Sequence, residues 1–504
     1  MSFGGTAPHT ADPSPFEKDY AEEESMRECE TVSRSPASGR VAGSYRDPSG
    51  YVFLREGRVF RAVDDDCAKT IRRLAEKGLL EPLVKRGFVI ETDFVTEPRL
   101  LASLQQEHAG YRHFLEHRRI DEVTYPYEWT VSMLADAAVL TLDLEIELLS
   151  AGFSLKDATA FNIQFIGARP VFIDIPSIEV PARLDLWYAL GQFNRMFLFP
   201  LLMARYRGWD LRSYFLGNLG GRDVDFVANA FGRLGRWRPG LWLDVTFPWL
   251  LGRMAEKKPS SPVKEPSSPS VNREPLLFNL RRLRKKILRL AQGFKPQGLW
   301  TSYTNICNYD RSAEDGKRRF VTEKLTEARC RHVLDMGCNT GEYSLVAAET
   351  GARVTAVDQD HDSVEVLYRN LRTSSHPILP LTLDITNPSP AVGFRNTERT
   401  TFAERIRPDC VLALALLHHL LVSGNLSLEA TCELFADLTE DYLLLEFVPP
   451  EDDMFQRLTR FRENLYTDMT LADCRRTYTA RFDILEERPV PDSKRVLLWM
   501  RKRR

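Results

Sequence analysis

His332-Val-Leu-Asp-Met-Gly-Cys-Asn-Thr-Gly341, followed by the helix-like run Glu342–Gly351, is the stretch that decides the fold of the second half of this chain. An apolar run, a glycine-containing turn and a helix N-terminus follow one another, which is the local pattern of a nucleotide-binding α/β unit. Glycine is needed at Gly337 and Gly341 because side chains there would fill the space of a ligand that approaches the backbone. We therefore expect backbone N–H groups and a helix dipole to face a ligand at this turn.

Two more strand-like runs follow, and each leads into an acidic residue. Arg353–Val357 precedes Asp358, about 20 residues after Gly337, where an open α/β sheet places a carboxylate against both ribose hydroxyls of a nucleoside. Leu379–Leu383 precedes Asp384 in the same way. Together with the glycine turn, these two acids predict a site for a nucleoside-containing cofactor.

The remaining strands indicate the fold class. Asp409–Leu414 is almost continuously apolar, as expected of a strand covered on both faces, and Tyr442–Phe447 follows it. Phe482–Glu487 and Arg495–Met500 flank a Pro-Val-Pro-Asp turn and predict an antiparallel pair. We predict an α/β fold: a Rossmann-like, seven-stranded sheet of the class I methyltransferase type with a terminal antiparallel hairpin. A nicotinamide-binding Rossmann domain fits less well, because the first turn is not G-x-G-x-x-G.

This half of the chain resembles a family of bacterial class I methyltransferases that includes host-specific nodulation-protein relatives. The similar segments cover about 200 residues in the family's order. They are WTSYTNICNYD (300–310), VLDMGCNTGEYS (333–344), VTAVDQD (354–360), ILPLTLDITNPSPAVGF (378–394), DCVLALALLHHL (409–420) and YLLLEFVPPEDD (442–453).

The resemblance implies S-adenosylmethionine as the cofactor. Asp358 would bind the ribose, Asp384 would meet the adenine amino group and Ile385 the ring, and Tyr309 lies in a segment that resembles a lid over the cofactor. Asn339 stands where the family often has glycine; asparagine tolerates unusual backbone angles and can donate to the methionine carboxylate. The cofactor-binding residues that we predict are Tyr309, Asp335, Gly337, Asn339, Gly341, Asp358, Asp384 and Ile385.

Candidate catalytic residues follow the fourth and fifth strands, where the carboxyl edge of the sheet opens. Methyl transfer from a sulfonium needs in-line approach, exclusion of water and, where the acceptor must lose a proton, a base. His418 and His419 follow the fourth strand, and Glu446 ends the fifth. For the two histidines the alternative is a packed, structural role.

The first half of the chain carries a second pattern. Asp157, Asn162 and Asp174 are spaced so that a hairpin between the last two would bring all three to one end of a cleft. This spacing weakly resembles that of protein kinases and aminoglycoside phosphotransferases, in which the first Asp orients the attacking hydroxyl and the other two residues hold magnesium. The alternative is a polar turn in an unrelated fold.

Several kinase features are missing from the sequence. There is no glycine-rich G-x-G-x-x-G loop, no V-A-I-K-like strand, and no glycine after Asp174. Lys85 or Arg61 could replace the phosphate-binding lysine. The first half is therefore predicted as an α+β domain that is possibly kinase-like, beginning with a hairpin at Gly50–Val63.

Composition shifts suggest four segments. Residues 1–45 are polar and rich in Ser, Pro and acids, so we expect disorder; 46–255 form the α+β domain; 256–275 form a Pro/Ser-rich linker; and 276–504 form the methyltransferase domain. This last segment begins with a basic amphipathic helix at residues 276–292. That helix is either packed on the following domain or in contact with an anionic glycan, lipid surface or nucleic acid.

The whole-chain charge and the cysteines limit the other function classes. The net charge of −2 gives no general attraction for nucleic acid, and the eight cysteines have no zinc or disulfide spacing, so we expect no metal and a cytoplasmic protein without a transmembrane segment. The predicted function is methyl transfer to a small-molecule or saccharide acceptor. The alternatives are a bifunctional methyltransferase–kinase that modifies a polysaccharide end, and a non-catalytic cofactor-binding scaffold or sensor.

Overall fold

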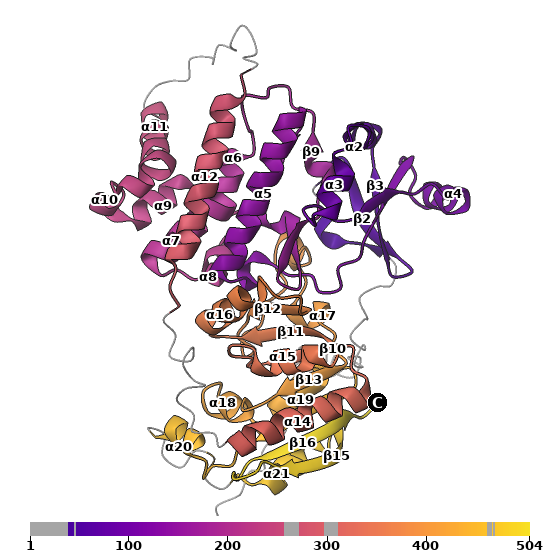
Figure 1. The fold of residues 1–504 in the computed structure, drawn as a ribbon, viewed down its shortest axis with the longest axis vertical. Coiled ribbons are helices and arrows are strands. Elements are labelled where there is room, and N and C mark those ends of the chain that lie inside the picture. Colours follow the sequence, from indigo (N-terminus) through magenta and orange to yellow (C-terminus); the bar gives the residue numbers. More distant parts are fainter. Residues whose placement is uncertain (1–38, 45–46, 257–271, 297–310, 461–465, 467–468) are drawn as a thin grey trace, which may run out of the picture.

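The computed structural model describes residues 39–44, 47–256, 272–296, 311–460, 466 and 469–504. Most of the predicted disordered segment, the middle of the predicted linker and Tyr309 lie outside the described residues. Figure 1 shows two stacked parts: an α+β part formed by the first half of the chain, and an α/β part formed by the second half.

The α/β part is built on the predicted seven-stranded sheet. Its strand order is β12-β11-β10-β13-β14-β16-β15; the first five strands are parallel, and β16 runs antiparallel to both β14 and β15. The prediction of a seven-stranded sheet with a terminal hairpin is thereby confirmed. The strands are β10 (His332–Met336), β11 (Arg353–Asp358), β12 (Ile378–Thr382), β13 (Cys410–Ala413), β14 (Tyr442–Phe447), β15 (Phe482–Pro489) and β16 (Val496–Lys502).

Helices cover both faces of this sheet, which explains why every residue of the central strands β10 and β13 is buried. The helices are α14 (Arg311–Ala328), α15 (Glu342–Glu349), α16 (His361–Leu371), α17 (Phe402–Arg405), α18 (Leu417–Val422), α19 (Leu428–Leu438), α20 (Asp453–Thr459) and α21 (Leu471–Tyr478).

The α+β part begins with a five-stranded antiparallel sheet of order β1-β2-β3-β5-β4. Glu56 and Gly57, with φ of 52° and 77°, form the turn of the predicted hairpin. The sheet starts at Gly39, within the segment expected to be disordered. Its elements are β1 (Gly39–Arg40), β2 (Gly50–Arg55), β3 (Arg58–Val63), α2 (Asp65–Glu76), α3 (Leu80–Lys85), β4 (Thr92–Phe94), α4 (Pro98–Glu107) and β5 (His113–His117).

A mainly helical region follows, centred on the long helix α5 (Val131–Ala151). Thr130 caps its beginning by accepting from the Met133 N–H, and Gly152 ends it in a left-handed conformation. The other elements are η3 (Pro126–Glu128), β6 (Ser154–Leu155), η4 (Ala160–Asn162), β7 (Ile163–Ile166), β8 (Arg169–Phe172), η5 (Ile175–Ser177), β9 (Ile178–Glu179), α6 (Leu190–Phe193), η6 (Asn194–Leu198), α7 (Phe199–Arg207), α8 (Leu211–Leu216), α9 (Val224–Ala230), α10 (Gly232–Gly235), η7 (Pro239–Leu241), η8 (Trp242–Thr246) and α11 (Phe247–Glu256).

The basic helix lies elsewhere than expected. α12 (Glu274–Gly293) packs along α5 and α7 of the α+β part, beside which it stands in Figure 1, and not on the α/β sheet. Five of its leucines and Ile287 are buried, and Arg284 pairs with Asp143 of α5 at 2.6 Å. One side of α12 is therefore packed, as one of the two alternatives predicted, but it packs on the preceding domain and not on the following one.

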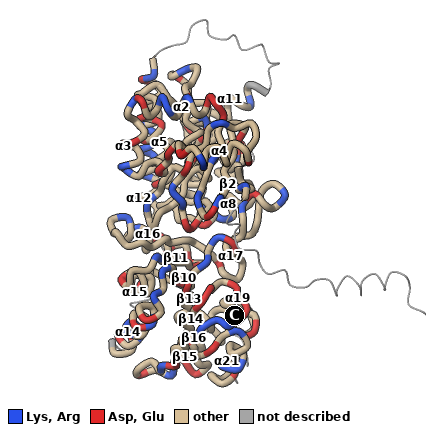
Figure 2. Tube along the Cα trace, turned by 90° about the vertical axis from the view of Figure 1, so that its right-hand side faces the viewer, with Lys and Arg blue, Asp and Glu red and all other residues tan. Residues whose placement is uncertain are grey.

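Buried acids join the two parts. Glu365 of α16 accepts the backbone N–H of Ser132, at the beginning of α5, at 3.0 Å, and it also pairs with Arg369 at 2.7 Å. Glu128 of η3 is fully buried and forms an ion pair with Arg405 of α17. Figure 2, in which charges of both signs are spread over both parts, shows the same stacking from the side.

The Glu128–Arg405 pair gives a test of this interface. Arg405→Ala would leave a carboxylate buried without its cation, so we expect the free energy of unfolding to fall by about 3–5 kcal/mol in urea titrations. Arg331→Ala, which removes a side chain that is 89% exposed, is the matched control and should change it by less than about 0.5 kcal/mol. Equal stability of the two variants would contradict a joined interface.

Candidate functional site

The turn after β10 is held in an unusual backbone conformation. Gly337, Asn339 and Gly341 all have positive φ, at 75°, 50° and 89°. A Cβ on Gly341 would lie 2.4 Å from Leu367 of α16, and one on Gly337 would lie 3.2 Å from Leu416. The positive φ and these close side chains both favour glycine at the two positions.

Asp358, at the end of β11, is hydrogen-bonded to this turn. Its two carboxylate oxygens accept the backbone N–H groups of Asn339 and Asp360, both at 2.9 Å. Burial raises the pKa of Asp358 above its ordinary value, while these N–H groups act in the opposite direction. Each oxygen keeps a lone pair, so the carboxylate can still accept hydrogen bonds from ribose hydroxyls.

Asp384 and Ile385 lie next to Asp358 along the carboxyl edge of the sheet. The Leu383 N–H donates to the Asp358 carbonyl at 2.8 Å, which joins the ends of β11 and β12. One Asp384 oxygen accepts both the N–H and the hydroxyl of Thr386, at 2.9 and 2.7 Å. Both predicted residues are half-buried, as suits groups at the wall of a binding site.

Asp335 occupies a different position from the other predicted cofactor residues. It is 3% exposed within β10, and its carboxylate accepts the Ser344 hydroxyl of α15 at 2.5 Å. Burial raises the pKa of Asp335 to about 6, against the effect of that hydrogen bond. The hydrogen bond between Asp335 and Ser344 fixes α15 next to the turn. Asp335 therefore supports the turn through α15.

Glu446 lies in a buried group of charges at the end of β14. It is fully buried and accepts from Lys317 of α14 at 2.6 Å, from the Ala415 N–H at 2.9 Å and from Arg495 at 3.3 Å. Burial alone would raise the pKa of Glu446, but Lys317 and Arg495 hold it below its ordinary value. Arg495 also binds Asp452 through two hydrogen bonds. Glu446 is therefore an ionised anchor for α14 and the last hairpin.

The two histidines that follow β13 are both uncharged near neutral pH. Burial, aided by the neighbouring charge of Arg495, lowers the pKa of His419 to about 4 and that of His418 well below its ordinary value. The His418 ring is 1% exposed and stacks on Phe455. Within the described residues, neither of its ring nitrogens is hydrogen-bonded to the protein.

The three residues of the phosphotransfer-like pattern come together in the α+β part. Asn162 donates to Asp174 at 3.3 Å, and burial followed by the charge of Asp174 raises the pKa of Asp157. Arg61 of β3 pairs with Asp174 at 2.6 Å and with Asp47. Of the two cations considered from the sequence, Arg61 is thus at the cluster.

Lys85 pairs instead with Glu81 at the surface. Sequence reasoning missed Asp47, Lys317 and Arg495, because their partners are distant in the chain and no motif surrounds them. All three lie in polar stretches of sequence, where a charged residue gives no signal of burial.

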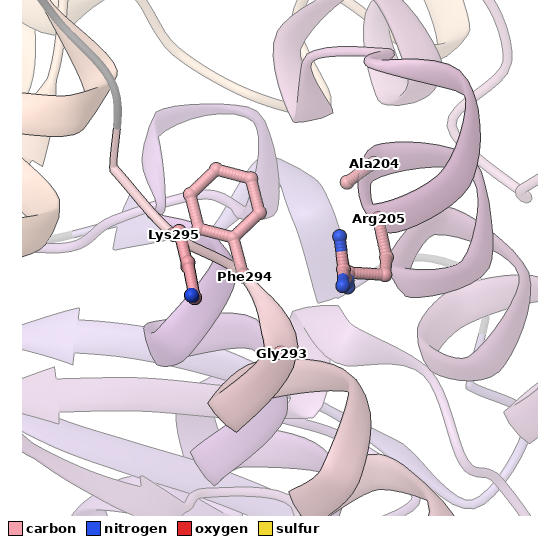
Figure 3. Close-up of a pocket in the computed structure, with 5 residues that line it drawn as sticks. All are labelled: Ala204, Arg205, Gly293, Phe294 and Lys295. Atoms are coloured by element: carbon pink, nitrogen blue, oxygen red, sulfur yellow. The ribbon is translucent and has the colours of Figure 1, made fainter.

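A hollow of about 400 Å³ lies between α7 and the end of α12 (Figure 3). The Phe294 ring meets the His361 ring of α16 edge-on, with centroids 5.3 Å apart. The hollow is lined by Ala204, Arg205, Gly293, Phe294 and Lys295. Within the described part of the chain, no three His, Cys, Asp or Glu side chains are grouped to hold a metal, and no helix is both long and apolar enough to cross a bilayer.

The glycine turn can be tested through a matched pair of substitutions. Gly341→Ala imposes a side chain at φ 89° and a clash with Leu367, whereas Gly351→Ala imposes one at φ 92° with no neighbour within 4 Å. Backbone strain should lower the free energy of unfolding of both variants by about 1–2 kcal/mol. The clash with Leu367 should lower that of Gly341→Ala further, and only this variant should bind S-adenosylhomocysteine weakly. Thermal unfolding and calorimetry measure these effects. Equal behaviour of the two variants would contradict the packing described.

The glycine turn and the acidic ends of β11 and β12 lie together at the carboxyl edge of a seven-stranded sheet with a terminal hairpin, as predicted for the class I methyltransferase fold. Among solved structures, the N-methyltransferase NodS of Bradyrhizobium japonicum is similar, with 14% identity, coverage of 39% of this chain and 99% of NodS, and a TM-score of 0.30. Magnesium protoporphyrin IX methyltransferase of Synechocystis has 16% identity, 43% and 96% coverage, and a TM-score of 0.30. At such TM-scores the fold assignment rests on strand order and site geometry alone.

No protein-family model matches the chain. A 76-residue stretch, 14% of this chain, is 34% identical to ribosomal RNA large subunit methyltransferase G of Aliivibrio salmonicida and covers 19% of it. The nodulation protein NoeA of Rhizobium meliloti is 33% identical over 478 residues, which cover 94% of this chain and 98% of NoeA. This identity extends over nearly the full length of both proteins and confirms the resemblance to nodulation-protein relatives; the chain belongs to the NoeA family.

Proposed function

We propose that the protein transfers the methyl group of S-adenosylmethionine to an oxygen, nitrogen or carbon nucleophile of a small, saccharide-containing acceptor. The observation that carries the proposal is the hydrogen bond between Asp358 and the Asn339 N–H, because it holds a ribose-binding carboxylate against the turn that would receive the methionine part. The saccharide is what the resemblance to nodulation-protein relatives implies.

The residues take separate roles in this proposal. Asp358 binds the ribose hydroxyls, Asp384 accepts from the adenine amino group, and Ile385 packs on the ring. The Asn339 side-chain oxygen belongs to the same turn; it is buried and has no hydrogen-bond partner among the described residues. The cofactor supplies an electrophilic methyl group, so the protein's task is to orient the acceptor and exclude water.

Proton removal from the acceptor falls to His418 in this proposal. Neither of its ring nitrogens is hydrogen-bonded to the described residues, so one of them is available to meet the proton of a bound acceptor. Glu446 is a poorer base, since two cations stabilise its ionised form. We assign Glu446 a positioning role for α14.

Cofactor binding gives the first measurement. Asp358→Ala removes charge-assisted hydrogen bonds to ribose, and we expect the affinity for S-adenosylhomocysteine in calorimetry to weaken by about 1.5–3 kcal/mol. Asp437→Ala, at an exposed position of α19, is the control and should leave the affinity unchanged. An unchanged affinity of the Asp358 variant would contradict the assignment of Asp358 to the ribose.

The same pair of variants tests the reaction and its acceptor. The protein is incubated with methyl-labelled cofactor and a cell extract, and mass spectrometry identifies the compound that gains a methyl group. A labelled saccharide that is made by the Asp437 variant and not by the Asp358 variant is the expected result. Tight cofactor binding without any labelled product would favour the scaffold or sensor alternative.

We also propose a second candidate activity, transfer of a phosphoryl group from a nucleoside triphosphate by the α+β part. The observation that favours it is the meeting of Asp157, Asn162, Asp174 and Arg61 at one point. Asp174 and Asn162 carry oxygens of the kind that bind Mg²⁺, which would hold the phosphates, and Arg61 replaces lysine as the cation. A kinase-like fold for this part stays a prediction.

Magnesium-dependent turnover of ATP tests this second activity. Asp157→Asn keeps the volume of the side chain while removing its charge, so we expect turnover to fall by at least about a hundredfold with little change in stability. Asp93→Asn, at an exposed position of β4, is the matched control. Turnover that is absent from the unaltered protein with every acceptor tried, or that survives in Asp157→Asn, would reject phosphoryl transfer.

A further inference from the structure

The helices at the upper left of Figure 1 include α10 and α11, and this segment carries several exposed large apolar side chains. Leu243, Phe247, Leu251 and Met254 follow one another at helical spacing along η8 and α11, and they are 46–62% exposed. Residues at this spacing lie on one side of a helix. Folded proteins rarely expose a contiguous apolar surface unless it binds something.

Two exposed tryptophans precede this stripe in the chain. The rings of Trp237 and Trp242 lie 5.4 Å apart and are 49% and 41% exposed. We call the surface formed by these two rings and the four stripe residues the α11 face. Indole rings combine a large apolar area with one N–H donor, and they are enriched where an apolar phase meets water.

Positive charges predominate around the α11 face, although α9, which packs against η8 and α11, carries the exposed acids Asp223 and Asp225 at its beginning. Asp244 is the sole acid between Gly232 and Met254, and it is buried and paired with Arg282 and Lys286 of α12. Because α12 turns these two cations toward η8, the neighbouring exposed positions Arg281, Lys285 and Arg289 form a basic stripe beside the face.

More cations lie among the aromatic rings of the same segment. Arg236 and Arg253 both stack on the Trp249 ring, at 4.3 and 5.1 Å from its centroid. Arg233 and Arg238 complete the positive charge of the segment. A surface of this kind is complementary to an apolar partner with an anionic boundary.

We propose that the α11 face is a docking surface for an anionic lipid bilayer. An apolar helical stripe with tryptophans and flanking Arg and Lys suits a helix that lies in the plane of the interface, with cations meeting lipid phosphates. A second copy of the chain fits less well, since a two-fold contact would bring the cationic borders together. The predicted cofactor residues Asp358 and Asp384 lie in the other part of the molecule.

Vesicle sedimentation of the full chain tests the proposal, with phosphatidylcholine vesicles and with vesicles that also contain the anionic phosphatidylglycerol. The unaltered protein should pellet with the anionic vesicles only, and less so as salt rises from about 0.1 to about 0.5 M. The double variant Leu243→Ser/Leu251→Ser should lower the partition coefficient about tenfold. The double variant Arg281→Glu/Lys285→Glu should do the same.

Matched controls use exposed residues of the other part. Leu485→Ser on β15 and Lys494→Glu in the last hairpin should bind vesicles as the unaltered protein does, and thermal unfolding shows that each variant is folded. Pelleting with neutral and anionic vesicles alike, pelleting with neither, or unchanged binding of both double variants would overturn the proposal. So would self-association in sedimentation velocity that the apolar variant abolishes, since the occupant would then be a second copy.

Discussion

The hydrogen bond from the Asn339 N–H to Asp358 is the contact on which the arrangement of the candidate cofactor site depends. It ties the turn after β10 to the end of β11, while the Leu383 N–H ties β12 to the same residue. Three loops from three neighbouring strands are thus held at one point of the sheet. Positive φ at Gly337 and Gly341 allows the turn to come close enough, and Leu367 of α16 fills the space behind it.

Buried acids perform the equivalent task at longer range. Glu446 fixes α14 and the last hairpin to β14, Glu365 fixes α16 to α5, and Glu128 fixes α17 to η3. Each is fully buried and each has a cationic partner. Such pairs add little net stability compared with apolar packing, but their loss is costly, so they determine how elements are arranged.

The strands and the acidic residues at their ends could be predicted from the sequence, but the ion pairs between residues far apart in the chain could not. The seven strands follow from apolar runs bounded by turns, and Asp358 and Asp384 follow from strand ends that parallel topology brings to one edge. The position of α12 was misread because its amphipathic pattern is the same whichever domain it covers. Lys317 and Arg495 carry no motif, and their importance appears only when folding brings them to Glu446. The roles of His418 and of Asp157, Asn162 and Asp174 remain predictions.

The packing of α12 determines where the polypeptide can be divided. The buried Leu280, Leu283 and Ile287 face the α+β part. A truncated protein that began at residue 276 would therefore expose the apolar side of α12 to water and would tend to aggregate. Cleavage of the backbone between 257 and 271 would instead leave α12 on the C-terminal fragment. Its packing on the α+β part would then keep the two fragments associated. Division after Gly293 respects the true border of the helical region.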